Sequence, residues 1–490
     1  MSRRLAALAA ALLAGVSLAH ARDSVTIGMA LEPTPGLDPT SGAVAAIGEV
    51  THYNIFEGLT KINEDFSFTP LLADSWTFSP DLKTLTLSLR QGVKFQDGEP
   101  FSSKDVKFSF ERYAANESIN KDKPFFVSIQ SIDATEPAKV ILTFKEPSFS
   151  ALFHLGLNTA VILDEKSAAN EGTQPVGTGP YKLSKWNKGS SVTLDAWDGY
   201  RDAGKIAIKH ATFKFISDAA AEAAAVLSGD IDDFPRIAAA SLDPFKADSR
   251  FQVMIGGSEG KTILAINNRK APLDQLKVRQ AIAYALDRKA IIDGASNGLG
   301  APIGSHLTPN DPGYVDLTGQ YPHDVAKAKA LLAEAGVKTP LALTLTLPPP
   351  TYARQGGEII AAELADIGIQ AKIENVEWPQ WAANVYTNHN YDLTIISHVE
   401  PLDIGIYANP NYYFQYDSKD FQAIIARWNA AADLAAYKQA LTDAQHKLAD
   451  DSVNGFIFQL PNVVVADANL KGIWKNAPIF ANDLAAMSWK

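Results

Sequence analysis

The sequence predicts an α/β protein, and three observations lead to that class. Residues 83–90 (KTLTLSLR) and 139–145 (KVILTFK) alternate apolar and polar side chains, as half-buried strands do. From residue 261 onward, strand-like and helix-like segments follow one another regularly, which is typical of a sheet flanked by helices. The chain has 490 residues, 46% of them hydrophobic, which suffices for two or three domains with large cores.

Strand signals dominate the chain from residue 34 to about Arg90. The segment 83–90 places its three leucines on one face and its threonine and serine side chains on the other. Residues 139–145 repeat this pattern and are its predicted partner strand. An alanine-rich helix is predicted within 216–232, with Gly229 at its C-terminal stop.

The second half of the chain alternates more regularly. Strands are predicted at 261–268, 341–347, 371–377 and 391–397. Helices are predicted at 273–286, 288–294, 325–336 and 355–369. Asp287 and Asp324 precede two of these helices, where their side chains can accept hydrogen bonds from the first backbone N–H groups.

The N-terminus reads as a secretory signal peptide. Arg3 and Arg4 form a basic start, an apolar run covers 5–18, and Ala19-His20-Ala21 has the small-x-small pattern of a cleavage site. We expect cleavage near Ala21 and export to the periplasm of a Gram-negative cell. No later stretch is apolar enough to predict a membrane span.

Charge and cysteine content exclude several classes of partner. The formal net charge is -11, and removal of Arg3 and Arg4 with the signal peptide makes it -13. An acidic body argues against a nucleic-acid partner, because phosphate contacts need clustered lysine and arginine. The chain has no cysteine, so it has no disulfides and no lipidated N-terminal cysteine.

The stretch IGGSEGKTIL, residues 255–264, resembles two catalytic motifs at first sight. Gly260-Lys261-Thr262 looks like the end of a phosphate-binding loop, and Gly256-x-Ser258-x-Gly260 like a hydrolase nucleophile elbow. The phosphate-loop spacing is one residue short, and both motifs require a helix next, whereas a strand follows. We therefore expect a glycine-rich turn between two strands, with Ser258 not a nucleophile.

No other pattern indicates catalysis or a cofactor. The nine histidines show no paired metal-ligand spacing, and His389 and the His398/Glu400 pair stand apart from further ligand residues. Carboxylates are so numerous that no glycosidase pair can be selected. We expect no catalytic residue, no metal and no cofactor.

Several stretches in register resemble the extracellular solute-binding proteins of the peptide/nickel/opine class, family 5, which serve ABC importers. The longest is PLLADSWTFSPDLKTLTLSLRQGVKFQDGEPFSSKDVKFSFER at 70–112. Other matching stretches lie at 37–39 (LDP), 54–63 (NIFEGLTKIN), 175–183 (PVGTGPYKL), 225–232 (AVLSGDID), 267–292 and 328–336 (AKALLAEAG). Together they cover essentially all of the chain after residue 21.

The resemblance implies a two-lobe periplasmic binding protein fold of type II, with a hinge between the lobes and an extra subdomain inserted in the first lobe. Carried onto this chain, lobe 1 comprises 22–55, 177–264 and 466–490. The inserted subdomain spans 56–176, and lobe 2 spans 265–465. The stretch 255–264 then lies at the first crossing between the lobes, where its glycines would allow unusual backbone angles.

The resemblance also places the ligand contacts in residues 391–418, where relatives often carry an aspartate that binds a ligand amine. In this chain Glu400 is the expected amine anchor, with Asp403 a second candidate and His398 beside them. Tyr412 and Tyr413 suit a pocket that stacks on a ligand and hydrogen-bonds to its edges. The same aromatic residues can instead pack the core of the lobe.

Three further ligand-binding candidates lie in neighbouring segments. Arg354 in the expected loop 347–355 lies where dipeptide binders can place an arginine for the ligand carboxylate, although it comes late in that loop. Trp378 and Trp381 follow the next strand, and either can face the cleft. Dipeptides, longer peptides, opines, amino-sugar conjugates and oligosaccharides remain open as ligands. Nickel is disfavoured, because the resembling proteins bind it through a chelate and little in this sequence suggests one.

The sequence thus predicts a monomeric periplasmic binding protein that captures a small amine-bearing solute and delivers it to an ABC permease with separate ATPase subunits. A carrier of an oligosaccharide or another non-peptide solute is the alternative in the same fold. A secreted hydrolase and a chaperone-like or sensory protein are alternatives from other classes.

Overall fold

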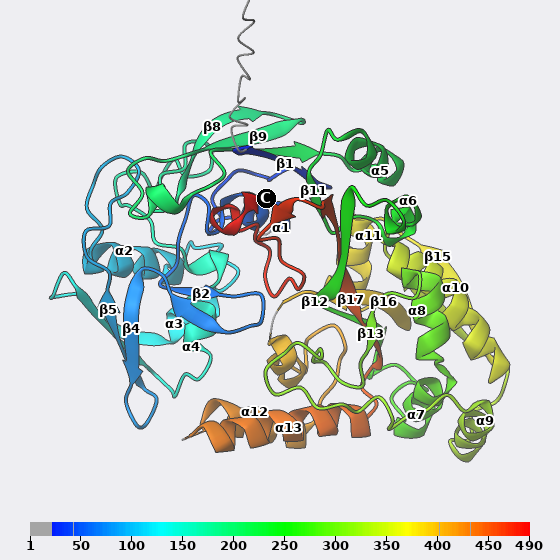
Figure 1. The fold of residues 1–490 in the computed structure, drawn as a ribbon. Helices are drawn as coiled ribbons and strands as arrows, with labels where there is room; N and C mark the ends of the chain where they lie inside the picture. The colour runs from blue at the N-terminus through cyan, green and yellow to red at the C-terminus, as the bar shows by residue number, and fades with distance from the viewer. Residues whose placement is uncertain (1–21, 43, 401, 432) are drawn as a thin grey trace, which may run out of the picture.

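The computed structural model describes residues 22–42, 44–400, 402–431 and 433–490 (Figure 1). The predicted signal peptide, residues 1–21, lies outside this part of the chain. Two lobes face each other. In Figure 1 the first lobe, with the C-terminus, occupies the top and left of the view, and the second occupies the right and bottom.

A large mixed sheet of eleven strands runs through both lobes. Ten of its strands follow the order β15-β14-β16-β12-β17-β11-β1-β10-β9-β8, and β13 pairs with β17. Their bounds are β1 (Ser24–Met29), β8 (Tyr181–Asn187), β9 (Ser191–Ala196), β10 (His210–Phe215), β11 (Asp233–Pro235), β12 (Phe251–Ile266), β13 (Ala301–Pro302), β14 (Leu341–Leu347), β15 (Ile369–Asn375), β16 (Leu393–His398) and β17 (Gly455–Asp467). The predicted α/β class is confirmed.

Three small sheets and the helices complete the fold. The small sheets use β2 (Thr60–Ile62), β3 (Phe68–Pro70), β4 (Ala73–Phe78), β5 (Thr84–Leu89), β6 (Ile129–Asp133), β7 (Lys139–Phe144), β18 (Leu470–Lys471) and β19 (Ser488–Trp489). The helices are α1 (Ala45–Thr51), α2 (Ser103–Ala114), α3 (Lys123–Ser128), α4 (Ala151–His154), α5 (Ala219–Ser228), α6 (Asp243–Lys246), α7 (Leu276–Ala285), α8 (Arg288–Ser296), α9 (Val325–Glu334), α10 (Thr351–Asp366), α11 (Trp378–Trp381), α12 (Lys419–Asn429) and α13 (Leu434–Asp450).

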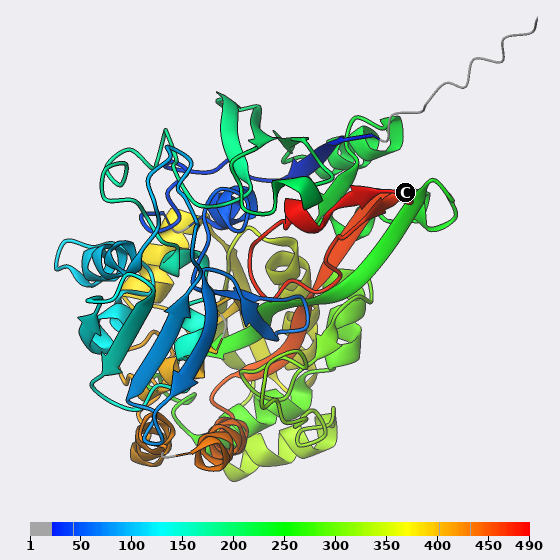
Figure 2. The ribbon, with the colours of Figure 1, turned by 60° about the vertical axis from the view of Figure 1, so that its left-hand side comes forward.

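Strands β12 and β17 join the lobes. They run side by side in antiparallel register from one lobe to the other (Figure 2). The first part of β12 pairs with the last part of β17 in the first lobe, where β11 also pairs with β17. The last part of β12 pairs with β16 in the second lobe. Residues 258–260 of β12 bulge opposite Leu460, so the two strands change register where they pass between the lobes.

The predicted turn at 255–264 is therefore wrong, because these residues lie within one long strand. Its glycines do not adopt unusual backbone angles, since none of them has a positive φ. They are needed because other parts of the chain come too close to leave room for a side chain. A Cβ on Gly256 would lie 2.0 Å from the carbonyl oxygen of Lys475, and one on Gly257 would lie 2.0 Å from Oδ1 of Asn310. The hydroxyl of Ser258 donates to the carbonyl oxygen of Leu460 over 2.8 Å, a structural contact inside the bulge.

The segment between β1 and β8 forms a four-stranded sheet of its own, in the order β4-β5-β7-β6. The predicted antiparallel pairing of 83–90 with 139–145 is confirmed by β5 and β7. The leucines of β5 are buried in the same hydrophobic cluster as β1 and β8–β10. Ser102 and Asp105 form a capping box that starts α2 against this sheet.

Most predicted elements of the second lobe are present. Asp287 and Asp324 accept hydrogen bonds from the first turns of α8 and α9, as expected for N-caps. One difference in boundary changes the setting of a candidate residue, because α10 begins at Thr351 and takes in most of the expected loop. Arg354 therefore lies in the first turn of a helix. Helices α7–α10 bury their apolar faces against β12, β14, β15 and β16.

Candidate solute-binding site

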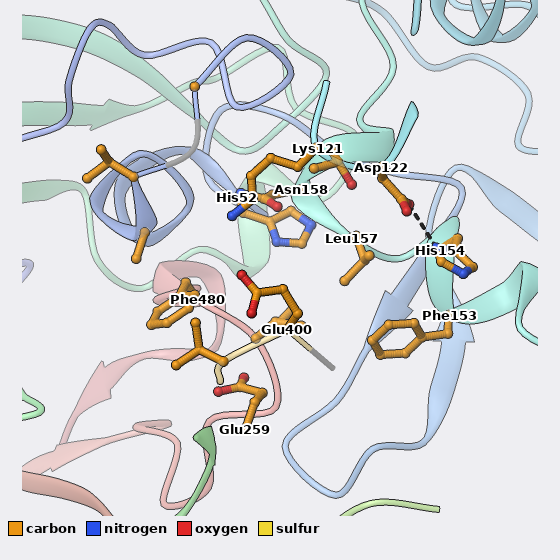
Figure 3. Close-up of a pocket in the computed structure, with 16 residues that line it drawn as sticks. His52, Lys121, Asp122, Phe153, His154, Leu157, Asn158, Glu259, Glu400 and Phe480 are labelled. Atoms are coloured by element: carbon orange, nitrogen blue, oxygen red, sulfur yellow. Dashed lines mark hydrogen bonds and ion pairs between the residues drawn. The ribbon is translucent and has the colours of Figure 1, made fainter. Parts of the chain in front are cut away.

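A pocket with a cavity volume of about 160 Å³ lies between the lobes, beside the point where β12 crosses (Figure 3). Both lobes and the C-terminal segment contribute to its wall. It is lined by Gly42, Val44, Ala45, His52, Lys121, Asp122, Phe153, His154, Leu157, Asn158, Thr159, Glu259, Val399, Glu400, Ile479 and Phe480. Such a pocket with apolar walls and a few polar groups is the usual form of a small-molecule site.

Glu400 is the one predicted ligand residue that lines this pocket. It follows β16, whose end opens into the cleft, as ligand sites of α/β sheets tend to do. The residue is exposed, and Figure 3 shows its carboxylate reaching toward His52 on the other wall. Its main-chain carbonyl oxygen accepts a hydrogen bond from Nζ of Lys261 over 2.5 Å, which fixes the backbone at this position.

Asp403 holds the same lysine rather than facing the pocket. Its Oδ1 lies 2.8 Å from Nζ of Lys261 and 3.0 Å from Nε2 of His306; the lysine and histidine side chains are buried, and that of Asp403 is only 9% exposed. Burial alone would raise the pKa of Asp403, but Lys261 and His306 hold that pKa well below its ordinary value. Asp403 is therefore an internal counter-ion whose charge is already matched within the protein.

His398 completes this buried cluster. Its Nδ1 lies 3.5 Å from Oδ2 of Asp403, and its Nε2 lies 2.9 Å from the hydroxyl of Tyr413. His306, His398 and Asp403 bring potential metal-ligand atoms within 4.8 Å of one another, a grouping that the spacing of the histidines did not reveal. The ammonium group of Lys261 already supplies a positive charge to Asp403 at this place.

Glu259 lies in the bulge of β12 and lines the pocket from the side of the crossing. The residue is only 3% exposed, and its Oε1 has no hydrogen-bond partner among the residues that the structure describes. Burial raises the pKa of Glu259 to about 8, against smaller opposite effects of Arg236 and Lys261. The carboxyl group of Glu259 is therefore mostly protonated, and so uncharged, at neutral pH.

The opposite wall presents His52, Lys121 and Asn158 (Figure 3). His52 is fully buried and, within the described part of the chain, neither ring nitrogen has a hydrogen-bond partner. Burial, with a smaller effect of Lys61, lowers the pKa of His52 to about 3, so its imidazole is neutral. Its ring stacks on that of Tyr53 at a centroid distance of 3.9 Å.

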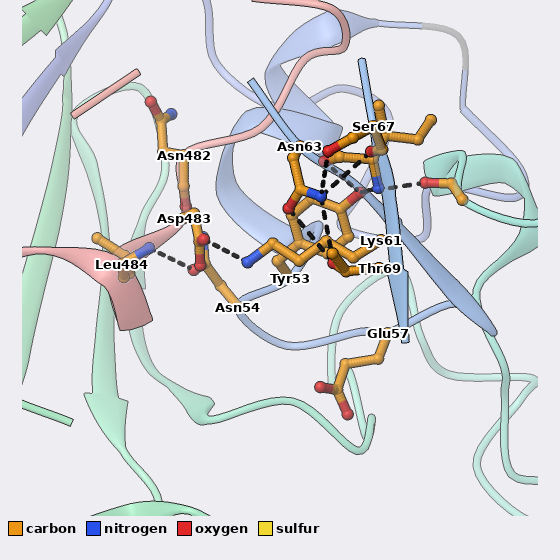
Figure 4. Close-up of polar contacts among 12 residues, drawn as sticks. Tyr53, Asn54, Glu57, Lys61, Asn63, Ser67, Thr69, Asn482, Asp483 and Leu484 are labelled. Carbon is orange, nitrogen blue, oxygen red and sulfur yellow. Dashed lines mark hydrogen bonds and ion pairs between the residues drawn. The ribbon is translucent and has the colours of Figure 1, made fainter. Parts of the chain in front are cut away.

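The C-terminal segment holds this wall in place (Figure 4). The side-chain amide of Asn54 donates to the carbonyl oxygen of Asn482 over 2.8 Å and accepts from the backbone N–H of Leu484. Lys61 forms an ion pair with Asp483. These contacts connect the segment that carries His52 to residues more than 400 positions later in the chain.

The other predicted ligand residues lie outside the pocket lining. Tyr413 and Trp381 are buried in the core of lobe 2, where the indole N–H of Trp381 donates to the hydroxyl of Thr394 over 3.0 Å. Tyr412 packs partly buried against the same core. Trp378 is exposed on the surface, and Arg354 forms an ion pair with Glu377 at 3.1 Å.

Sequence reasoning missed the groups that complete the pocket, namely Glu259, His52, Lys121 and Asn158. Glu259 stood inside a motif that was read for its serine and lysine. His52 directly precedes the family-like stretch 54–63, but nothing in the sequence indicates that its ring faces a cleft.

Two lobes that share a pair of crossing strands and enclose a pocket define a two-lobed solute-binding protein. The chain belongs to the bacterial extracellular solute-binding proteins, family 5, whose middle region matches residues 67–438. Proteins of this family are the solute-binding components of ABC importers, and the family consists of transport proteins rather than enzymes. They are extracellular, which in Gram-negative cells means the periplasm.

Individual relatives agree with this assignment. The glutathione-binding protein GsiB of Salmonella typhi is 30% identical over 361 residues, which is 72% of this chain and 69% of that protein. The structure of AgaA from A. tumefaciens R10, in complex with agropinic acid, has a TM-score of 0.80 at 27% identity and covers 95% of this chain and 99% of its own. CtaP from Listeria monocytogenes has a TM-score of 0.86 at 21% identity, covering 96% of this chain and 100% of its own, and so shows the fold.

Among the helices of the described residues, none combines the length and apolar character needed to cross a membrane.

Asp403→Asn is expected to destabilise the protein strongly. The substitution removes the negative charge that balances the buried ammonium of Lys261, and breaking a buried ion pair typically costs about 3–5 kcal/mol. Denaturant unfolding measures the loss. Asp243→Asn is the matched control, because its ion pair with Lys246 is exposed to solvent and should contribute little to stability. Equal stability of the two variants would contradict the role assigned to Asp403.

Glu259→Gln is expected to change how stability depends on pH. Between about pH 4.5 and pH 8 the unfolded chain releases the Glu259 proton while the folded protein keeps it, so the wild-type protein loses stability as pH rises. The loss is at most ~1.4 kcal/mol per pH unit. The variant lacks this pH-dependent loss, so its melting temperature relative to that of the wild type should rise from pH 5 to pH 9. The exposed Glu358→Gln is the control, and a parallel pH profile for Glu259→Gln would refute the assignment.

Proposed function

We propose that this protein captures a small solute with a free ammonium group, a short peptide or an opine-like compound, in the pocket between its lobes. The observation that carries the proposal is the carboxylate of Glu400, which enters the pocket from lobe 2 with no ion-pair partner among the described residues. The loaded protein then delivers the solute to an ABC permease, whose separate ATPase subunits drive transport.

The chemistry of Glu400 favours an amine over an uncharged solute. A carboxylate that becomes shielded from water on closure binds an ammonium through charge-assisted hydrogen bonds, which are stronger than neutral ones. The backbone of Glu400 is held by Lys261, so little ordering is needed when the solute arrives. An oligosaccharide would leave this charge without a partner, which makes the alternative carrier less suitable.

Closure of the lobes is supported by the way in which they are connected. Among the described residues, only β12 and β17 run from one lobe into the other within the large sheet, and both change register at the crossing. Phe149 of the inserted subdomain and Tyr437 of α13 contact each other across the two lobes, with ring centroids 4.7 Å apart. A solute that contacts both walls stabilises the closed arrangement by its additional contacts there.

The ligands of relatives support the same solute class. GsiB is a glutathione-binding protein, and glutathione is a small peptide with a free ammonium group. AgaA was solved with agropinic acid.

We further propose that the protein acts as a monomer in the periplasm after cleavage near Ala21, beside a permease in the inner membrane. In this proposal lobe 1 comprises residues 22–55, 177–264 and 466–490, and lobe 2 comprises 265–465. The inserted subdomain spans 56–176.

Glu400→Gln is expected to weaken binding of an amine-bearing peptide by roughly 30-fold or more, because removing one partner of a shielded charge pair costs about 2–5 kcal/mol. Isothermal titration calorimetry measures the affinity. The melting temperature should stay unchanged, since the side chain is exposed. Glu358→Gln is the matched control outside the pocket. Intact affinity together with a lowered melting temperature would assign Glu400 a structural role instead.

Small-angle scattering is expected to show a smaller radius of gyration when such a peptide is added. The solute has to favour the closed state by its differential affinity, because equal affinity for open and closed forms shifts nothing. Glu400→Gln should keep the larger radius at a peptide concentration that saturates only the wild type. Tight binding by the wild type with no change in radius would contradict a hinged carrier.

A further inference from the structure

Glu259 is a second carboxyl group in the pocket, and the proposed capture of an ammonium by Glu400 does not use it. The bulge of β12 opposite Leu460 turns this side chain toward the pocket, where a regular strand would continue its alternation. Its Oε1 is buried without a hydrogen-bond partner among the described residues. A buried polar atom without a hydrogen-bond partner destabilises the folded protein, and a ligand that donates a hydrogen bond to it removes that cost.

The lining of the pocket offers the two carboxyl groups few positive charges, and the two cations that act on Glu259, Arg236 and Lys261, lie outside that lining. In Figure 3 the side chain of Glu400 lies between Glu259 and His52, and all three line the same pocket. The imidazole of His52 is neutral, so it does not repel a cation. Asp122 on the far wall is engaged with His154 at 2.8 Å, and Lys121 is the one basic side chain with a permanent charge in the lining.

We propose that Glu259 forms a second cation subsite, and that the solute carries a basic side chain in addition to its ammonium group. The proposal rests on the proposed function. One ammonium binds Glu400, and the second cationic nitrogen enters deeper and donates to Glu259. The preferred solutes are therefore short peptides or opine-like compounds derived from lysine, ornithine or arginine.

A second cation fits this place better than a hydroxyl or an apolar group. An apolar group would leave Oε1 of Glu259 without a partner, and a hydroxyl could supply a hydrogen bond to it but no charge that attracts the carboxylate of Glu400. A cation between them gains from both, because charges interact strongly in a site from which water is excluded. Three charged groups of the protein act on Glu259. Arg236 and Lys261 lower its pKa and Asp311 raises it, so their effects partly cancel.

The test compares two dipeptides that differ only in the side-chain charge, L-lysyl-L-alanine and L-norleucyl-L-alanine. Calorimetry at pH 7 measures both against the wild type, Glu259→Gln and Glu400→Gln. The wild type should bind the lysyl peptide at least about 10-fold more tightly than the norleucyl peptide. Glu259→Gln should abolish that preference and keep the affinity for the norleucyl peptide, whereas Glu400→Gln should weaken both.

A second measurement needs no variant. Binding of the lysyl peptide should ionise Glu259 and release a proton, so the observed heat should depend on the ionisation enthalpy of the buffer. Both peptides carry the same α-ammonium group, so its contribution cancels in the comparison. Equal buffer dependence for the two peptides would overturn the inference, even where Glu259→Gln fails to fold.

The remaining outcomes separate the inference from the function on which it rests. Equal affinity of the wild type for both peptides, or a preference that survives in Glu259→Gln, overturns the second cation subsite and leaves capture by Glu400 in place. Binding of neither peptide overturns the proposed function and the inference with it. A loss of affinity for both peptides in Glu259→Gln alone would make Glu259, and not Glu400, the ammonium anchor.

Discussion

The ammonium group of Lys261 is almost fully buried where β12 enters the second lobe, and much of the pocket depends on it. It donates to Asp403 and to the main-chain carbonyl oxygen of Glu400, so one charge neutralises an acid and fixes the backbone of the ligand-facing residue. Asp403 in turn holds His306, and His398 lies beside it. A buried charge is tolerated only when its partners are in place, so this cluster requires one arrangement of the segment after β16.

The same strand also forms part of the connection between the lobes. Glu259 in the bulge and Lys261 just beyond it are two residues apart, yet one lines the pocket and the other points into the second lobe. The bulge separates these directions, and it lies at the change of register between β12 and β17. A movement of the lobes about this crossing would therefore act directly on Glu259, while the lysine cluster would move as part of lobe 2.

How much the sequence revealed depended on the range of each interaction. The pattern of 83–90 predicted a strand and its partner, and Asp287 and Asp324 predicted helix starts, because those signals are local. The glycines at 255–264 were misread, since what requires them is the approach of Lys475 and Asn310 from distant parts of the chain. Likewise, Asp403 and Glu400 are acidic residues of the same segment, and only the fold shows that the carboxylate of Asp403 forms the ion pair with Lys261.

The division of roles between these two acids follows from their partners. Asp403 cannot bind a solute amine without withdrawing from Lys261, which would leave a buried ammonium unbalanced, so its charge is unavailable to the pocket. Glu400 faces the pocket because the hydrogen bond from Lys261 goes to its carbonyl oxygen, while its carboxylate acts on that lysine only at longer range. The lysine thus satisfies the internal acid and positions the external one. A pocket built in this way holds its ligand-facing charge in place before any solute arrives, which reduces the ordering cost of binding.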